Sequence, residues 1–141
     1  MKGKMKNIHR NQSKGKSAEI LFELMCTRLG WGCCKPIADF MQYDYLIERE
    51  DGVFEKVQVK TSFYDKNKKC IRCDLRRSKA KSNNKTRYET GDFDIVAIPI
   101  EVSKWIIIPW DKIKGKSEIN LSDKRIYNGV ATIVQFDIED I

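Results

Sequence analysis

Asp44, Gln58 and Lys60, near the middle of the chain, are residue types that together can act on a phosphodiester. A carboxylate and an amide oxygen are ligands that Mg²⁺ accepts, and such a site leaves positions open for water and phosphate. A lysine beside them can orient or help deprotonate an attacking water and offset the negative charge that develops in the transition state. This chemistry requires all three side chains on one face of one structural element.

The residues from Asp44 to Lys60 predict a β-hairpin that meets this requirement. Apolar and polar residues alternate on both sides of Asp51-Gly52, as in strands, and Asp-Gly is a strong hairpin-turn signal. A two-residue loop would place Asp44 on the opposite face from Gln58 and Lys60. We predict instead a three-residue loop, Glu50-Asp51-Gly52, with the glycine in the left-handed conformation, because it places Asp44 opposite Gln58 and keeps a mostly apolar face separate from the polar one.

Asp44 followed by Gln58-Val59-Lys60 resembles the core motif of the PD-(D/E)xK nuclease superfamily, with glutamine in place of the usual acidic residue and Tyr43 in place of the proline. The order of elements is most similar to group I intron-associated endonucleases and archaeal Holliday-junction resolvases. The matching segments, over roughly residues 14 to 113, are Lys14 to Glu19 opening a helix, a glycine-aromatic turn, the hairpin, Leu75 to Ser78, Phe93 to Ala97 and Trp105 to Pro109. The resemblance implies an α/β fold with a restriction-endonuclease-like core, a central mixed β-sheet flanked by helices.

The resemblance also implies roles for individual residues. Asp44 would be a direct metal ligand, Gln58 would offer its carbonyl oxygen or hold a metal-bound water, and Lys60 would position the nucleophile. Related nucleases use a glutamate of the first helix beside the strand aspartate, so Glu19 would be a further ligand that restores the acidity Gln58 lacks; support of the helix dipole is the alternative for Glu19. The implied cofactor is Mg²⁺, with Mn²⁺ able to substitute, and one tightly held ion because a neutral amide is a weaker ligand.

The charge distribution favours a polyanionic partner. The chain has 27 Lys and Arg against 20 Asp and Glu, a net charge of +7. The basic residues gather in residues 1–16 and 66–87, and phosphate neutralisation is the main source of non-specific DNA affinity, although a solvated tail and loop is the alternative. The predicted DNA-binding residues are Lys14, Lys16, Thr61, Ser62, Arg72, Arg76, Arg77, Lys79, Lys81, Lys85 and Arg87.

Length and composition predict one domain over residues 14–141, preceded by a basic flexible arm over residues 1–13. The longest apolar runs are far too short to span a bilayer, and no apolar segment follows the basic N-terminus, so we expect a cytoplasmic protein with no membrane partner. The five cysteines, an odd number, favour reduced thiols. Cys70 and Cys73 have C-x-x-C spacing, but the intervening residues read as strand, which argues against structural zinc.

The remaining elements follow from periodicity and from turn residues. The predicted elements are a helix from Ser13 or Lys14 to Leu29, an edge strand after Gly32, a third hairpin partner over Cys70 to Arg76, a loop over Ser78 to Thr90, a second hairpin of Ile95 to Ile100 and Trp105 to Pro109 covered on both faces, a short helix at Trp110 to Ile113, and a strand within Ala131 to Phe136.

Three functions remain open from the sequence. The first is a metal-dependent DNA endonuclease that hydrolyses phosphodiester bonds, homing-type or resolvase-like, acting as a homo-oligomer (a dimer or higher) because cutting both strands together needs two sites. The second is a non-catalytic DNA-binding module with a decayed nuclease site, which Gln58 favours. In the third, Asp44 and Lys60 are only a cross-strand pair, which leaves both basic stretches unexplained.

Overall fold

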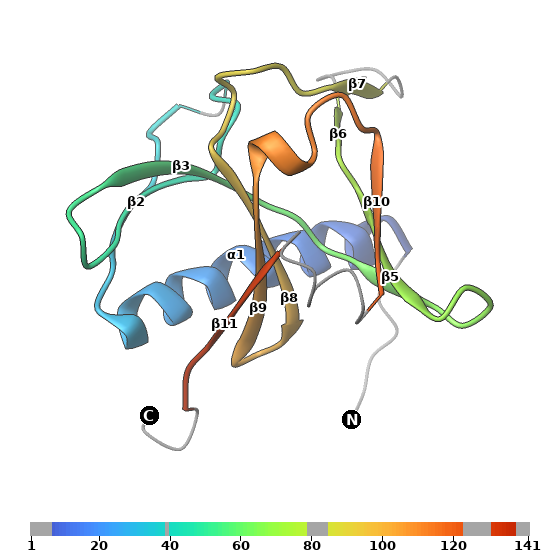
Figure 1. The fold of residues 1–141 in the computed structure, drawn as a ribbon, viewed down its shortest axis with the longest axis horizontal. Coiled ribbons are helices and arrows are strands. Elements are labelled where there is room, and N and C mark those ends of the chain that lie inside the picture. Colours follow the sequence, from blue (N-terminus) through green and yellow to red (C-terminus); the bar gives the residue numbers. More distant parts are fainter. Residues whose placement is uncertain (1–6, 39, 79–84, 123–130, 138–141) are drawn as a thin grey trace.

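The computed structural model describes residues 7–38, 40–78, 85–122 and 131–137 (Figure 1). Its elements in chain order are α1 (Asn7–Leu29), β1 (Gly32–Cys34), β2 (Tyr45–Glu48), β3 (Phe54–Val59), β4 (Phe63–Asp65), β5 (Cys70–Asp74), β6 (Arg76–Ser78), β7 (Lys85–Arg87), β8 (Ile95–Glu101), β9 (Lys104–Pro109), the 3₁₀ helix η1 (Trp110–Lys112), β10 (Glu118–Leu121) and β11 (Thr132–Gln135).

A six-stranded sheet in the order β1-β2-β3-β8-β9-β11 forms the centre of the fold. The β3–β8 pair is parallel and the other pairs are antiparallel, so the sheet is mixed. Helix α1 lies across one face (Figure 1). This arrangement confirms the predicted restriction-endonuclease-like α/β fold, in which β1 is the predicted edge strand.

The first core lies between α1 and this sheet. The helix contributes Ala18, Phe22 and Met25, which recur at spacings of three and four and therefore share one face. The Phe22 ring stacks on Tyr45 of β2 at 5.1 Å between centroids and meets Trp105 of β9 edge-on at 5.5 Å. These contacts fix the helix against the strands that carry the predicted site.

A second core covers the opposite face of β8 and β9. Along β8, Ile95 and Ala97 face α1, whereas Val96 and Ile98 pack against residues of a three-stranded sheet in the order β10-β5-β4. Both faces of the second hairpin are therefore buried, as its continuous apolar sequence predicts. In the described residues this second sheet, and not another helix, covers the face opposite α1.

Three predictions about the elements are wrong: the start of the helix, the pairing of one strand and the extent of one loop. The helix begins at Asn7 and not at Ser13 or Lys14, because apolar periodicity marks only the turns that contact the sheet and no proline or glycine interrupts the preceding turns. The segment from Cys70 does not pair with the first hairpin: β5 pairs with β4 and β10, and β8 takes the place beside β3. The predicted loop after Ser78 contains β7, which pairs with β6.

The structure also bears on the predictions about membrane spans and cysteines. Within the part of the chain that the structure describes, no helix has both the length and the apolar character needed to cross a membrane. All five cysteines are free thiols. Cys70 and Cys73 are both buried in strand β5.

Candidate active site

The hairpin of β2 and β3 has the register that the three-residue loop predicts. Tyr45 pairs with Val57, and the Asp44 N–H donates to the Val57 carbonyl at 2.8 Å. Gly52 has φ +77°, the left-handed conformation that a glycine adopts without strain. The polar residues of the motif therefore meet at the open end of the hairpin, where β2 begins and β3 ends.

Two hydrogen bonds hold the Asp44 carboxylate against β3. Its Oδ2 accepts from the Gln58 side-chain Nε2 at 2.9 Å and from the Val59 backbone N–H at 2.8 Å. An ionised carboxylate only accepts hydrogen bonds, so Gln58 must turn its nitrogen toward Asp44, and Oε1 is its remaining polar atom. Gln58 thus orients the aspartate by hydrogen bonding, without adding a second negative charge.

Burial raises the pKa of Asp44 to about 6, since desolvation disfavours the charged form. The Val59 N–H opposes this shift, the negative charge of Glu19 adds to it, and the positive charges of Lys60 and Lys35 again oppose it. A carboxylate whose pKa is raised by desolvation and by a neighbouring carboxylate is typical of functional sites. A cation at this position would offset both effects.

Asp44 and Glu19 open onto the same cleft, of about 320 Å³, between the start of β2 and helix α1. The Glu19 side chain is 28% exposed, and its Oε2 lies 3.6 Å from the Lys16 Nζ. The helix turn is fixed to β2 because the Tyr45 hydroxyl shares its one proton between Glu23 Oε2 at 2.8 Å and the Glu19 carbonyl at 3.2 Å. The cleft is lined by Lys16, Glu19, Lys35, Pro36, Ala38, Met41, Tyr43 and Asp44.

Lys60 follows β3 directly and lies outside the described lining of that cleft. Its backbone N–H donates to the Ala97 carbonyl at 3.0 Å, which continues the pairing of β3 with β8. Its Nζ donates to the Arg76 carbonyl at 3.0 Å and lies 4.9 Å from the centre of the Tyr88 ring. The ammonium group is thus held at the base of the β6–β7 hairpin, close enough to Asp44 for its charge to lower the pKa of that aspartate.

The donor atoms of this site suit a hard divalent cation. Asp44 and Glu19 both present carboxylates to the cleft, and Mg²⁺ is commonly held by one or two carboxylates with water completing its shell. Among the described residues, no group of three His, Cys, Asp or Glu side chains is placed to hold a metal.

The predicted DNA-binding residues near the N-terminus and after Lys60 lie on neighbouring elements. The Lys14 Nζ donates to the Ser62 carbonyl at 2.8 Å, which ties α1 to the segment after β3. Thr61 and Ser62 are half-buried in that segment, and Lys16 borders the cleft. These four residues, Lys14, Lys16, Thr61 and Ser62, therefore lie around the end of β3, the strand that carries Gln58.

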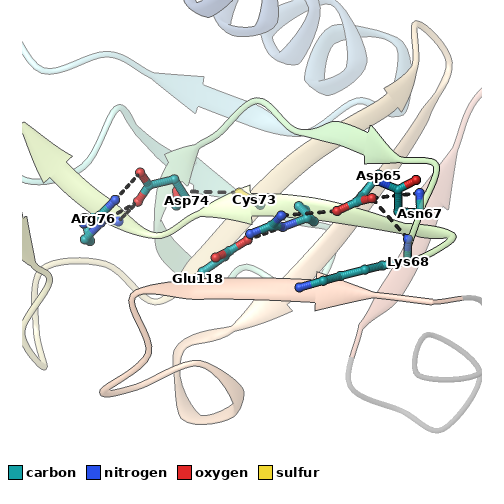
Figure 2. Close-up of polar contacts among 8 residues, drawn as sticks. Asp65, Asn67, Lys68, Cys73, Asp74, Arg76 and Glu118 are labelled. Atoms are coloured by element: carbon teal, nitrogen blue, oxygen red, sulfur yellow. Dashed lines mark hydrogen bonds and ion pairs between the residues drawn. The ribbon is translucent and has the colours of Figure 1, made fainter.

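The guanidinium groups of Arg72 and Arg76 belong to a set of ion pairs on β4, β5, β6 and β10. The Arg72 guanidinium contacts Asp65 at 3.2 Å and also Glu118, and Arg76 contacts Asp74 at 3.1 Å. Figure 2 shows these carboxylates spaced along the same sheet. The positive charges of Arg72 and Arg76 are therefore balanced within the protein.

The other predicted contacts belong to the β6–β7 hairpin and the segment that joins its strands. Arg77 donates from Nε to the Thr86 hydroxyl at 3.1 Å, and Arg87 is exposed. Lys85 begins β7. Lys79 and Lys81 lie outside the described residues.

Two residues of the site have no signal in the sequence. Lys35 borders the cleft with Asp44, and Tyr88 contacts Lys60. Neither belongs to the sequence motif, and Tyr88 lies in a segment predicted as a loop. Only the meeting of segments distant in sequence places them at the site.

The chain is similar to a family of endonucleases, to a phage protein and to a solved homing endonuclease. A family model described as PD-(D/E)XK endonuclease matches residues 9–135. Protein 5.3 of Escherichia phage T7 is 30% identical over 105 residues, which cover 74% of this chain and 85% of that protein. The solved structure of a bacterial homing endonuclease, I-Ssp6803I, superposes with a TM-score of 0.65 at 31% identity and covers 81% of this chain and 80% of its own. The chain has the motif and a mixed sheet, and the family model matches nearly its whole length. The protein therefore belongs to the PD-(D/E)XK endonuclease family.

Proposed function

We propose that the protein is a Mg²⁺-dependent endodeoxyribonuclease whose active site is formed by Asp44, Glu19, Gln58 and Lys60. One observation carries this proposal: Asp44 and Glu19, from a strand and a helix, border one cleft while Gln58 fixes the aspartate. The desolvation that raises the pKa of Asp44 favours the binding of a cation, because the ion would restore the charged carboxylate.

Asp44 and Glu19 would hold the metal, Mg²⁺ or Mn²⁺, with Gln58 supplying its Oε1 or a bond to a water of the ion's shell. When bound, the ion polarises the phosphoryl oxygen and lowers the pKa of a water molecule. Asp44 and Glu19 would set the position of that ion, and Gln58 and the Val59 N–H keep Asp44 from rotating away. Lys60 would orient the attacking water and offset charge on the phosphate.

The substrate in this proposal is DNA. The β6–β7 hairpin and the start of α1 carry Lys and Arg, and Thr61 and Ser62 carry hydroxyl groups. These groups would bind phosphates without reading sequence. Similarity to a bacterial homing endonuclease favours a homing-type cut in duplex DNA, and a resolvase-like cut at a junction is the alternative substrate preference.

The proposed enzyme is a homo-oligomer, a dimer or higher, in the cytoplasm. Each chain offers one cleft that joins Asp44 and Glu19, so a cut through both strands at one site requires a second copy. The free thiols of the chain suit a reducing compartment. Sedimentation of the protein with and without DNA tests the assembly.

Gln58 supports a second function, a DNA-binding module without catalysis. An amide at this position gives the site one negative charge fewer than a glutamate would, and weaker metal binding follows. This alternative keeps the basic residues and the DNA affinity. It predicts binding that depends strongly on salt and no cleavage that depends on metal.

Cleavage of supercoiled plasmid and of a four-way junction tests the proposal, with Mg²⁺ or EDTA and with wild type beside Asp44→Ala. Activity that needs both the ion and Asp44 supports the nuclease. The preferred DNA then separates a duplex cutter from a resolvase. Tight binding without cleavage, on DNA that contains the target sequence, supports the non-catalytic module.

A further inference from the structure

The Lys60 side chain is held by two groups that neither the family motif nor the cleft includes. Its Nζ donates to the Arg76 carbonyl at 3.0 Å and lies 4.9 Å from the centre of the Tyr88 ring. A cation over an aromatic face within about 6 Å is attracted by the ring quadrupole, and the attraction grows as water is excluded. Tyr88 is only 9% exposed, so its ring is largely removed from water, and Lys60 is half-buried against it.

Both groups belong to the base of the β6–β7 hairpin. Arg76 begins β6 and pairs with Arg87 at the end of β7, and Tyr88 is the next residue. The hairpin therefore presents a carbonyl and an aromatic ring to the same ammonium group. The backbone of Lys60 is bound separately to Ala97 of β8, so the side chain bridges the central sheet and the hairpin.

The Tyr88 ring is itself fixed by the second core. It meets Phe93 edge-on at 5.0 Å between centroids, and Phe93 in turn meets Trp110 at 5.2 Å. Burial raises the pKa of the Tyr88 hydroxyl, and the negative charge of Asp44 raises it further, so the ring lies within electrostatic range of the catalytic carboxylate. A ring fixed by its core neighbours is a rigid platform for a flexible lysine.

We propose that Tyr88 is a positioning residue for Lys60, and that with the Arg76 carbonyl it couples the lysine to the β6–β7 hairpin. The inference rests on the proposed nuclease function for its effect on the reaction. A lysine has four rotatable side-chain bonds, and these two contacts restrict its ammonium to one side of the site. DNA phosphates bound by the arginines of this hairpin would then act on the same hairpin whose Arg76 carbonyl and adjoining Tyr88 hold Lys60.

Substitution of Tyr88 separates positioning from packing. Tyr88→Leu removes the aromatic face, and we expect kcat to fall roughly 100-fold with KM nearly unchanged, because a displaced catalytic group costs rate and leaves phosphate affinity in place. Tyr88→Phe keeps the face and should recover most of that loss. Phe93→Leu measures the cost of lost packing by itself, since it removes the ring that packs against Tyr88 and keeps the aromatic face beneath Lys60.

A second measurement does not depend on cleavage. The side-chain signals of Lys60 in ¹³C-labelled protein, assigned by their loss in Lys60→Arg, should be shifted upfield by the Tyr88 ring. The shift should persist in Tyr88→Phe and in Phe93→Leu and disappear in Tyr88→Leu. If Tyr88→Leu does not fold, the wild-type and Tyr88→Phe spectra still decide whether the contact exists.

Lys60 signals without an upfield shift in the wild type would overturn the inference. So would a Tyr88→Leu enzyme that cleaves as fast as the Phe93→Leu control. Wild-type protein that leaves every DNA intact contradicts the proposed nuclease instead, and the spectra alone then decide whether Tyr88 holds the lysine.

Discussion

Gln58 donates a hydrogen bond from Nε2 to Asp44 Oδ2 at 2.9 Å across the β2–β3 hairpin, so the amide of the motif orients the carboxylate directly. A glutamate at position 58 could make this bond only when one of the two carboxyl groups is protonated, because two ionised carboxylates are both acceptors. Glutamine therefore gives the metal-free site a more stable arrangement than two adjacent carboxylates would have.

This relationship predicts the effect of Gln58→Glu. Without metal, the variant should be less stable than wild type at neutral pH by about 1–3 kcal/mol, since a hydrogen bond is lost and a like charge is added in a desolvated site. Mg²⁺ should raise the melting temperature of the variant more than that of wild type, because a ligand stabilises the state that binds it more tightly. Thermal unfolding with EDTA and across a Mg²⁺ series measures both effects. Gln135→Glu, which adds the same charge on exposed β11, is the control and should show neither effect.

Asp44→Asn should remove a pH dependence of stability. The folded pKa of Asp44, about 6, lies above its ordinary value, so the folded protein binds the proton more tightly than the unfolded chain does. The stability from this group is present at low pH and falls as pH rises from about 4 to about 6. In EDTA at pH 7, Asp44→Asn should therefore be more stable than wild type by up to about 3 kcal/mol. Urea unfolding from pH 3.5 to 7.5 gives the difference, and a gap that stays constant over this range would contradict the prediction.

Lys60→Ala should abolish cleavage and leave DNA binding largely intact. Phosphate affinity is spread over many basic residues, whereas Lys60 is the only lysine of the motif. Cleavage rates and gel-shift affinities measured on the same DNA separate the two effects. Lys56→Ala, which removes an equal charge from the same strand, controls for the loss of charge. Binding that is lost in parallel with cleavage would show that the two functions are not divided in this way.

Arg87 should contribute more to DNA affinity than Arg72. Arg72 contacts Asp65 and Glu118, whereas Arg87 is exposed and makes no ion pair within the described residues. Arg87→Gln should reduce the slope of log affinity against log salt concentration by about one, and Arg72→Gln by clearly less. Fluorescence anisotropy over a salt series measures the slopes. Equal slopes for the two variants would mean that DNA phosphates replace Asp65 and Glu118 as the partners of Arg72.

The sequence alone determined the hairpin, its three-residue loop and the face shared by Asp44 and Gln58. These features are local: strand alternation and the conformational freedom of Gly52 fix the register within 17 residues, whatever lies around them. The two strands of the apolar hairpin, β8 and β9, were predictable for the same reason, because burial on both faces is visible in a continuous apolar run.

Only the tertiary structure decided which distant groups meet this hairpin. The pairing of β3 with β8 and the placement of β5 in a second sheet depend on how two apolar faces are covered, and several partners satisfy the same alternation. The structure places Glu19 and Lys35 beside Asp44, and Tyr88 beneath Lys60. Residue types indicated the chemistry, but contacts between segments far apart in the chain set the charge and orientation of each group in the site.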